Sequence, residues 1–414
     1  MSDARVGTPI PAAGPSFSFG FNMGKIPDHG EDADPILRDG PDLGLVGVFD
    51  GMGGAGGTVY ETDDGPRSGA YIASRIARDV VEDRMLELLE PDWNLRGEAA
   101  AADLHRSMQK ALQERLAELK APTSRLRSKL LRALPTTMAV MGLQRSHRDG
   151  SRWSCHVFWA GDSRAYVIEA NGIRQLSTDD LRDSGDAMTN LHQDSVVSNA
   201  ISADTEFHVN YRRVELDAPF LLVCATDGCF GYLPSPMHFE RLILKCLDGA
   251  SSVDGWSAAL QREIGAVTGD DAAMSVMGVG ANFRSAKALF APRLRELDAD
   301  VITPLDDAAA AVARAERELD QLRRHQVDVA ATQWNAYKTG YEKFLHQEST
   351  ASDESDLEVN EEESITEMIE PTGSDDSAPE EETEALLASN ADATIATEVP
   401  TGASAEPITQ SEWR

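Results

Sequence analysis

The sequence is poor in basic residues, in cysteine and in long apolar runs, and each shortage excludes a class of protein. Its 414 residues contain 38 Lys and Arg against 70 Asp and Glu, and the net charge of -32 disfavours non-specific binding to nucleic acid or to an anionic membrane. No apolar run approaches the roughly 18 residues of a membrane span, and the start MSDARVGTP lacks a secretion signal. We therefore expect a soluble, cytoplasmic protein.

The few cysteines lie in or beside apolar runs and lack the spacing of a zinc site: Cys155, Cys224, Cys229 and Cys246. Cysteines in such surroundings behave as small apolar side chains. The pattern predicts buried free thiols in a reducing compartment and disfavours disulfides.

The composition divides the chain into four segments. Residues 1–16 are rich in Pro, Gly and Ala, which predicts a flexible N-terminus. Residues 17–284 mix strand-like and helix-like runs, and residues 285–346 are helix-prone. Residues 347–414 contain 20 acidic residues and one basic residue with almost no aromatics, which predicts a disordered acidic tail.

Strand-like and helix-like patterns follow one another irregularly in the second segment. The runs SFSFGF, LGLVGVF and PTTMAVMGL read as strands, whereas residues 68–89 and 96–119 have the apolar spacing of amphipathic helices. Residues 153–279 are mainly strand-like, with HFERLILKCL and WSAALQREIGAV as helices among them. This order predicts a layered α+β domain and disfavours regular βαβ winding.

The helix-prone extension has two apolar patterns. A heptad-like spacing joins small and apolar residues: Ala308, Val312, Ala315, Leu319, Leu322 and Val329. Four aromatic residues then share one helical face: Trp334, Tyr337, Tyr341 and Phe344. We expect a helical hairpin packed on the body. The aromatic face is either its docking surface or a binding site for a partner of the extension.

Acidic residues recur where strand-like runs begin or end: Asp50, Asp162, Asp227 and Asp270. Each of them alone is typical of an ordinary turn or cap. A charge at the edge of an apolar core is nevertheless costly unless it is paired or binds a cation, and few bases lie beside these acids. Their recurrence therefore raises the possibility of a shared site.

Glu31 and Asp32 in the segment GEDAD extend this set of acids. Carboxylates without His or Cys favour Mg²⁺ or Mn²⁺ over Zn²⁺. One carboxylate that bridges two ions about 4 Å apart could hold a water acidic enough to attack phosphorus at neutral pH. The spacing alone leaves both a metal site and a set of unrelated turns open, and it does not name the reaction.

Five segments between about residues 17 and 280 resemble, in order, the motifs of the metal-dependent protein phosphatase family of the PPM or PP2C type, in its bacterial form: VFDGMGG, PTTMAV, AGDSRAY, ATDG and GDDAAMSV. The resemblance implies a central sandwich of two antiparallel β-sheets flanked by helices, with metal ions in a cleft at one end. It also implies hydrolysis of phosphoserine and phosphothreonine by direct attack of a metal-bridging water, without a phosphoenzyme.

The resemblance assigns roles by motif position. Asp50 would bridge two Mn²⁺ or Mg²⁺ ions, and the backbone carbonyl of Gly51 would bind one of them. Asp227 and Asp270 would complete the set of ligands around the first ion. Asp50 and Asp227 are thus the candidate catalytic residues.

The same comparison assigns the remaining acids. Glu31 would bind the second ion, and Asp32 would contact the metal site through bound water. Asp162 matches the acid that binds a third, weaker ion in bacterial members. All seven candidate metal-binding positions of the family pattern are therefore present.

Three departures from the family pattern concern the substrate. Pro27 stands where the family has an arginine that grips the phosphate, and Lys25 is the tentative replacement, a point charge without the fork of a guanidinium. Losing that contact would weaken binding by about 1.5–3 kcal/mol. Met52 and Asp180 replace histidines, and residues 198–204 lack the usual arginine of the flap.

The favoured function is a serine/threonine protein phosphatase that acts on phosphorylated proteins and opposes an intracellular Ser/Thr kinase. A pseudophosphatase or adaptor that binds phosphoproteins or partners without turnover is the alternative, and a phosphatase of small molecules is a third. The one basic cluster is either a solvated helix face or a site that captures the acidic tail: Arg125, Arg127, Lys129 and Arg132.

Overall fold

The computed structural model describes residues 14–26, 29–63, 65–89, 95–119, 131–145, 151–183, 185–192 and 195–345. The chain divides into two compact units, one up to Asp328 and one from Val329. The predicted flexible N-terminus up to residue 13, Pro27, most of the basic cluster and the acidic tail lie outside the described residues. The domain boundary expected after residue 284 stays a prediction.

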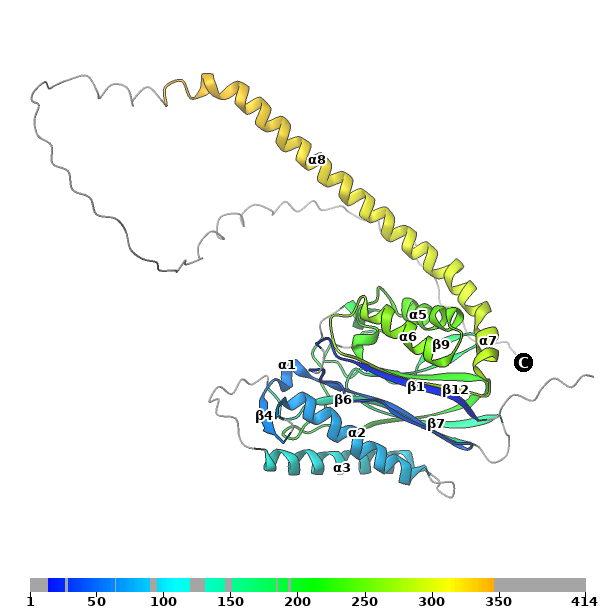
Figure 1. Ribbon diagram of the computed structural model, residues 1–414. Helices are drawn as coiled ribbons and strands as arrows, with labels where there is room; N and C mark the ends of the chain where they lie inside the picture. Colours follow the sequence, from blue (N-terminus) through cyan, green and yellow to red (C-terminus); the bar gives the residue numbers. More distant parts are fainter. Residues whose placement is uncertain are drawn as a thin grey trace, which may run out of the picture. The chain divides into compact units, whose positions relative to one another are not determined.

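Two five-stranded antiparallel sheets form the centre of the first unit (Figure 1). One sheet runs in the order β1 (Pro15–Met23), β12 (Ala272–Val279), β11 (Phe220–Ala225), β8 (Arg164–Glu169), β9 (Gly172–Gln175). The other runs β10 (Asn210–Asp217), β7 (Arg152–Ala160), β6 (Thr136–Arg145), β3 (Leu43–Gly51), β2 (Ile36–Asp39). A separate hairpin joins β4 (Val59–Thr62) to β5 (Gly65–Ser68).

The alternation of apolar residues along β3 explains how the sheets are covered. Leu45 and Phe49 belong to the core between this sheet and its helices, whereas Val46 and Val48 belong to the core between the two sheets. Successive side chains of a strand point to opposite faces, so an unbroken apolar run fills both cores. A strand of this composition is therefore stable only when both of its faces are covered.

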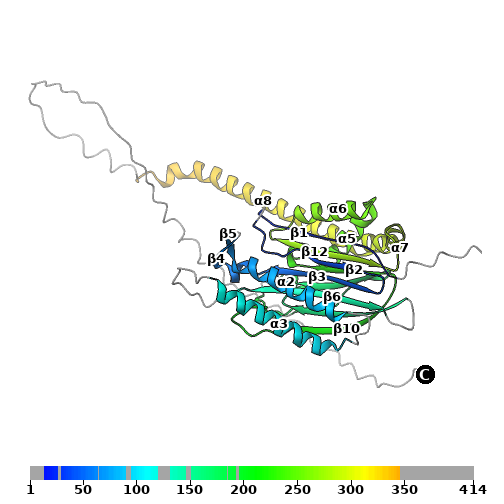
Figure 2. The ribbon, with the colours of Figure 1, turned by 60° about the horizontal axis from the view of Figure 1, so that its bottom comes forward.

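Helices cover the outer face of each sheet (Figure 2). Helices α2 (Gly69–Leu88) and α3 (Gly97–Glu118) share a core with β3 and β6. Helices α5 (Pro236–Gly249), α6 (Val253–Gly265) and α7 (Phe283–Glu296) share another with β1, β11 and β12. Short helical turns complete this unit: α1 (Gly53–Gly56), α4 (Thr189–His192) and η1 (Asp227–Cys229). The predicted α+β sandwich flanked by helices is confirmed.

The extension begins within α7, and its remaining part forms one long helix, so the predicted hairpin is wrong. The π-helical segment η2 (Leu297–Ile302) leads from α7 into the 39-residue helix α8 (Thr303–Tyr341), none of whose residues is buried. From Leu305 to Thr339 the segment contains neither Gly nor Pro and is rich in Ala and Arg, so nothing in it favours a turn. Docking of its aromatic face stays a prediction.

All four cysteines are free and buried, as the sequence predicts, while the reducing compartment stays a prediction. Burial raises the pKa of Cys155 to about 12 and the pKa of Cys246 to about 11. None of the described helices combines the length and the hydrophobicity that crossing a membrane requires.

Candidate functional site

The register of one sheet brings two of the predicted acids to the same end. Asp50 pairs with Thr137 at the start of β6, where the Thr136 hydroxyl donates a hydrogen bond of 2.5 Å to the Asp50 carbonyl. The next residue of β6, Met138, lies opposite Ala160, the last residue of β7. The chain then turns through Gly161 into Asp162, so this acid follows a strand end at the same edge as Asp50.

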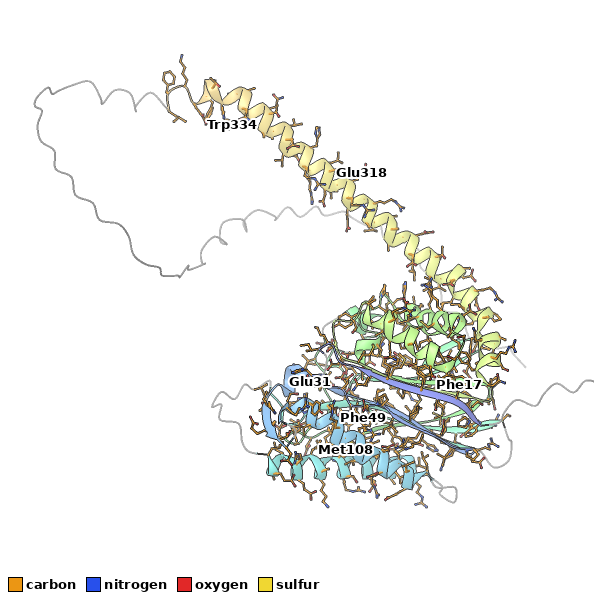
Figure 3. The ribbon with its side chains drawn as sticks, in the orientation of Figure 1. Phe17, Glu31, Phe49, Met108, Glu318 and Trp334 are labelled. Carbon is orange, nitrogen blue, oxygen red and sulfur yellow. The ribbon has the colours of Figure 1, made fainter. Side chains whose placement is uncertain are left out.

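The second sheet ends in the same way. Ala225, the last residue of β11, lies opposite Met274 near the start of β12, and Met23 at the end of β1 lies opposite Ala272. Asp227 therefore follows β11 and Asp270 precedes β12 at one edge. The segment after β1 leads to Glu31, which lies at the end of the sandwich near α1 (Figure 3).

The gathered acids, which we call the acid rim, are Glu31, Asp32, Asp50, Asp162, Asp227 and Asp270. Their exposure is graded. Asp32 is buried, Asp50, Asp162 and Asp227 are half-buried, and Asp270 is exposed. The rim therefore runs from the protein interior to solvent, which allows a dissolved ion to reach it.

Electrostatics show that these acids face one another. Burial, followed by the charges of Asp32 and Asp227, raises the pKa of Asp50 well above its usual range. Burial and then the charge of Asp227 raise the pKa of Asp162 to about 7. Burial also raises the pKa of Asp227, with the charge of Asp270 adding to the effect. The acid rim thus holds more negative charge than its surroundings neutralise.

Hydrogen bonds fix the inner part of the rim. The Asp32 carboxylate accepts hydrogen bonds from Gly51 N (3.3 Å) and from the Thr226 hydroxyl (3.0 Å). Burial raises the pKa of Asp32 well above its usual range, and the Thr226 hydrogen bond opposes that rise. Asp32 is therefore the most buried acid of the rim, and its hydrogen bonds join the two sheets.

Asp271 is a residue that the sequence reasoning missed. Its carboxylate accepts hydrogen bonds from the backbone nitrogens of Lys25 (2.7 Å) and Glu31 (2.5 Å), and so fixes the segment after β1. Asp270 was assigned from the same acid pair, but nothing in the sequence distinguished a carboxylate that faces the other acids from one that binds backbone. Ser68, another missed residue, caps α2 and donates to the Glu31 carboxylate.

Two glycines permit the close approach of Glu31. A Cβ on Gly51 would clash with the Glu31 carbonyl, and a Cβ on Gly53 would clash with its carboxylate. Gly51 is therefore required where the segment after β1 crosses the end of β3, because backbone atoms occupy the space of a Cβ there.

The donor atoms of the acid rim suit divalent cations, but their positions do not form a set of ligands around one ion. Its donors are carboxylate oxygens, which Mg²⁺ and Mn²⁺ prefer, and it carries uncompensated negative charge. Among the residues that the structure describes, however, no three His, Cys, Asp or Glu side chains are placed to hold a single ion. Binding of an ion would therefore require some of these side chains to change conformation.

The substrate-side predictions have mixed outcomes. Lys25 is exposed, and its role with phosphate stays a prediction. Asp180, which stands where the family often has histidine, accepts hydrogen bonds from Gly161 N (3.1 Å), Asn199 Nδ2 (2.7 Å) and Asn210 Nδ2 (2.9 Å). It therefore ties the segment 198–204 to the turn that carries Asp162.

Comparison with known proteins gives one family. The sequence model described as Protein phosphatase 2C matches residues 34–264, which is more than half of the chain. No curated protein matches the chain.

Several solved structures resemble the chain at low identity. A bacterial serine phosphatase is 15% identical (TM-score 0.47) and covers 64% of this chain and 99% of its own. Staphylococcus aureus Stp1, a serine/threonine phosphatase, is 16% identical (TM-score 0.44; 64% and 95%). The catalytic domain of the serine/threonine protein phosphatase PstP, solved with two manganese ions, is 14% identical (TM-score 0.41; 64% and 98%).

Proposed function

The chain belongs to the protein phosphatase 2C family, and we therefore propose that it is a metal-dependent phosphatase of phosphoserine and phosphothreonine in proteins. The observation that carries this proposal is the acid rim. Acids from five separate parts of the sequence meet at one end of the sandwich, where burial and neighbouring acids raise the pKa values of Asp50, Asp162 and Asp227. Such a cluster is unfavourable unless a cation neutralises it, so cation binding would explain why the acids are gathered.

We assign the first ion to the carboxylates of Asp50, Asp227 and Asp270 with the carbonyl of Gly51. Bound divalent ions would lower the pKa of a water, so that hydroxide is available at neutral pH. Asp50 would contribute to holding both ions, because acids from both sheets lie near it.

The second ion is assigned to Glu31, with Asp32 acting through bound water, and a third, weaker ion to Asp162. The chain holds Glu31 in place through its backbone nitrogen and through the Ser68 hydroxyl. Asp32 is similarly fixed by Gly51 and Thr226. These contacts restrict the motion of Glu31 and Asp32 before any ion arrives, although the full set of ligands would form only on binding.

The nearest thiol supports hydrolysis without a covalent intermediate. Cys229 follows Asp227 by two residues, but burial and then the charge of Asp32 raise its pKa well above its usual range. Its Sγ donates a hydrogen bond to the Ala273 carbonyl (3.3 Å). A buried, protonated thiol of this kind is a poor nucleophile.

The test is release of phosphate from a phosphopeptide across a Mn²⁺ titration. We expect wild-type protein to turn over the peptide, and Asp50→Asn or Asp227→Asn to lower the rate by at least about 10²-fold, the scale of losing one electrostatic stabiliser. Asp217→Asn removes an acid far from the rim and should retain the wild-type rate. Manganese binding without turnover by the wild-type protein would refute the proposal.

The second candidate is a pseudophosphatase or adaptor. It is favoured by the absence, among the described residues, of three carboxylates placed around one ion, and by Pro27 in place of the phosphate-binding arginine. Binding and turnover of the same phosphopeptide distinguish the two candidates. Equal affinity of wild-type and Asp227→Asn protein for the peptide, with no turnover by either, favours the adaptor. Rates on small phosphate esters, measured alongside, test the small-molecule alternative.

A further inference from the structure

A polar cavity beside the acid rim is lined by positively charged side chains and, in the described part of the chain, by no acid. Its volume is about 280 Å³, close to the lower end of the 300–1,000 Å³ typical of ligand sites. It is lined by Asn22, Gly24, Gly30, Arg67, Tyr71 and Arg75. In a chain of net charge -32, a cavity lined by two arginines and no acid selects for anions.

Both arginines lie against the aromatic ring of Tyr71. The guanidinium carbon of Arg75 lies 3.4 Å from the centre of the Tyr71 ring, and that of Arg67 lies 4.5 Å from it. A cation is attracted to an aromatic face at these distances. Both positive charges therefore lie against the same ring at the lining of the cavity, where an anion would stabilise them.

Arg75 connects the cavity to the acid rim. It donates hydrogen bonds to the carbonyls of Glu31 (3.1 Å) and Gly30 (3.3 Å) and to that of Tyr71 (3.1 Å). These acceptors are neutral, and among the described residues no carboxylate forms an ion pair with Arg75, although the charges of Asp34 and Asp32 reach it. Because Gly30 lines the cavity and Glu31 belongs to the rim, a group bound in the cavity lies next to the rim.

Asn22 indicates that the occupant also brings a hydrogen-bond donor. Its side-chain nitrogen donates to the Asp32 carbonyl (2.8 Å), which fixes the orientation of the amide. Its Oδ1 is buried and accepts no hydrogen bond from the described part of the chain. A phosphorylated peptide offers both the anion and backbone N–H groups.

We propose that this cavity is a subsite for a phosphate group of a phosphopeptide, with Arg67 supplying the guanidinium that the sequence lacks at Pro27. This inference rests on the proposed function for its substrate class. The phosphate is either the one that is hydrolysed or a second one on the same peptide. Lys25, the earlier expectation for this role, is exposed and does not line the cavity.

Arg67→Gln tests the subsite, since Arg75 also holds the backbone of Gly30 and Glu31 and its loss would disturb the rim. We expect KM for a singly phosphorylated peptide and for a small phosphate ester to rise about tenfold with kcat little changed, the effect of losing a hydrogen bond to a charged group. Arg67→Lys should recover part of the loss. A rise confined to a doubly phosphorylated peptide would assign the subsite to the second phosphate.

The control is Arg262→Gln on α6, an exposed arginine whose partner is the neighbouring Glu263. Thermal unfolding of each variant separates a folding defect from a binding defect. The effect of Lys25→Gln should be smaller than that of Arg67→Gln, and the reverse order would overturn the proposal.

A binding measurement separates this inference from the proposed function. Calorimetry with the full chain and a singly phosphorylated peptide, without added divalent metal, should show affinity about tenfold weaker for Arg67→Gln. If wild-type protein binds the peptide through Arg67 but never hydrolyses it, the proposed function fails and the subsite stands. If Arg67→Gln matches wild-type protein in both KM and affinity, the subsite is refuted while the phosphatase proposal is untouched.

Discussion

The protein contains two kinds of buried or half-buried acid, and they differ in what neutralises them. Asp179, which follows β9, is paired with Arg164 at 2.6 Å, and their side chains are 2% and 3% exposed. Glu240 is paired in the same way with Arg293 at 2.8 Å. In the acid rim, by contrast, the strongest neighbours of Asp50 are other acids.

The difference separates acids that hold the fold together from acids that carry chemistry. A carboxylate that is matched by a guanidinium is satisfied and needs nothing further. A group of carboxylates that raise one another's pKa values costs stability, and such groups concentrate at functional sites. The comparison therefore makes opposite predictions for the two sets when an acid or its partner is removed.

Breaking the buried pair should have the largest effect. In Arg164→Met the carboxylate of Asp179 would stay buried with only the amides of Gln175 and Asn190 as donors. Loss of one partner of a buried pair typically lowers the free energy of unfolding by 3–5 kcal/mol, so we expect a loss of about that size in urea titrations. A loss below about 1 kcal/mol would show that the pair is not structural.

The stability of the metal-free protein should depend on pH because of the uncompensated acids of the rim. The folded-state pKa of Asp162 is about 7, against 3.8 for an ordinary Asp, so the folded state holds a proton that the unfolded state has released. Stability should therefore fall between pH 4 and pH 7 and remain low above it. Allowing for partial exposure, we expect a fall of about 2 kcal/mol.

Mn²⁺ provides the matching measurement. Because the ion binds deprotonated carboxylates, it should raise the melting temperature more at pH 8 than at pH 5. A melting temperature that rises equally at both pH values would mean that the acid rim does not bind the metal.

Removing one charge from the acid rim should have a smaller effect, of the opposite sign to Arg164→Met. Asp162→Asn eliminates one of the repelling carboxylates, and in the absence of metal at pH 8 it should raise the free energy of unfolding by about 1 kcal/mol. It should also flatten the pH profile. Destabilisation by this variant would show that Asp162 is held by favourable contacts and does not belong with the uncompensated acids.

Much of the fold followed from local sequence patterns. The strands β3, β6 and β11 and the helices α2, α3, α5 and α6 were expected because their apolar spacing is strong and tertiary contacts agree with it. The hairpin in the extension failed, since a heptad pattern does not encode a turn, and α8 contains no residue that would break a helix between Leu305 and Thr339.

The acid rim could be predicted only in part. Asp50 and Asp227 stand out because each ends an apolar strand before a glycine. Asp271 and Arg67 did not, because their importance depends on what the fold brings near them: the backbone of Lys25 and Glu31 in one case, and the ring of Tyr71 in the other. Spacing on one helix could have linked Tyr71 to Arg75, four residues later, but not to Arg67 on β5.

The smallest effect should come from an acid that is paired but exposed. Asp217 and Arg152 lie opposite each other on β10 and β7, 3.2 Å apart, with side chains 67% and 53% exposed. Solvent already stabilises both charges, so Asp217→Asn should change the free energy of unfolding by less than about 1 kcal/mol at any pH between 5 and 8. Urea titrations beside Arg164→Met measure the contrast directly. A loss as large as that of Arg164→Met would mean that pairing alone, and not pairing combined with burial, distinguishes the structural acids from the acid rim.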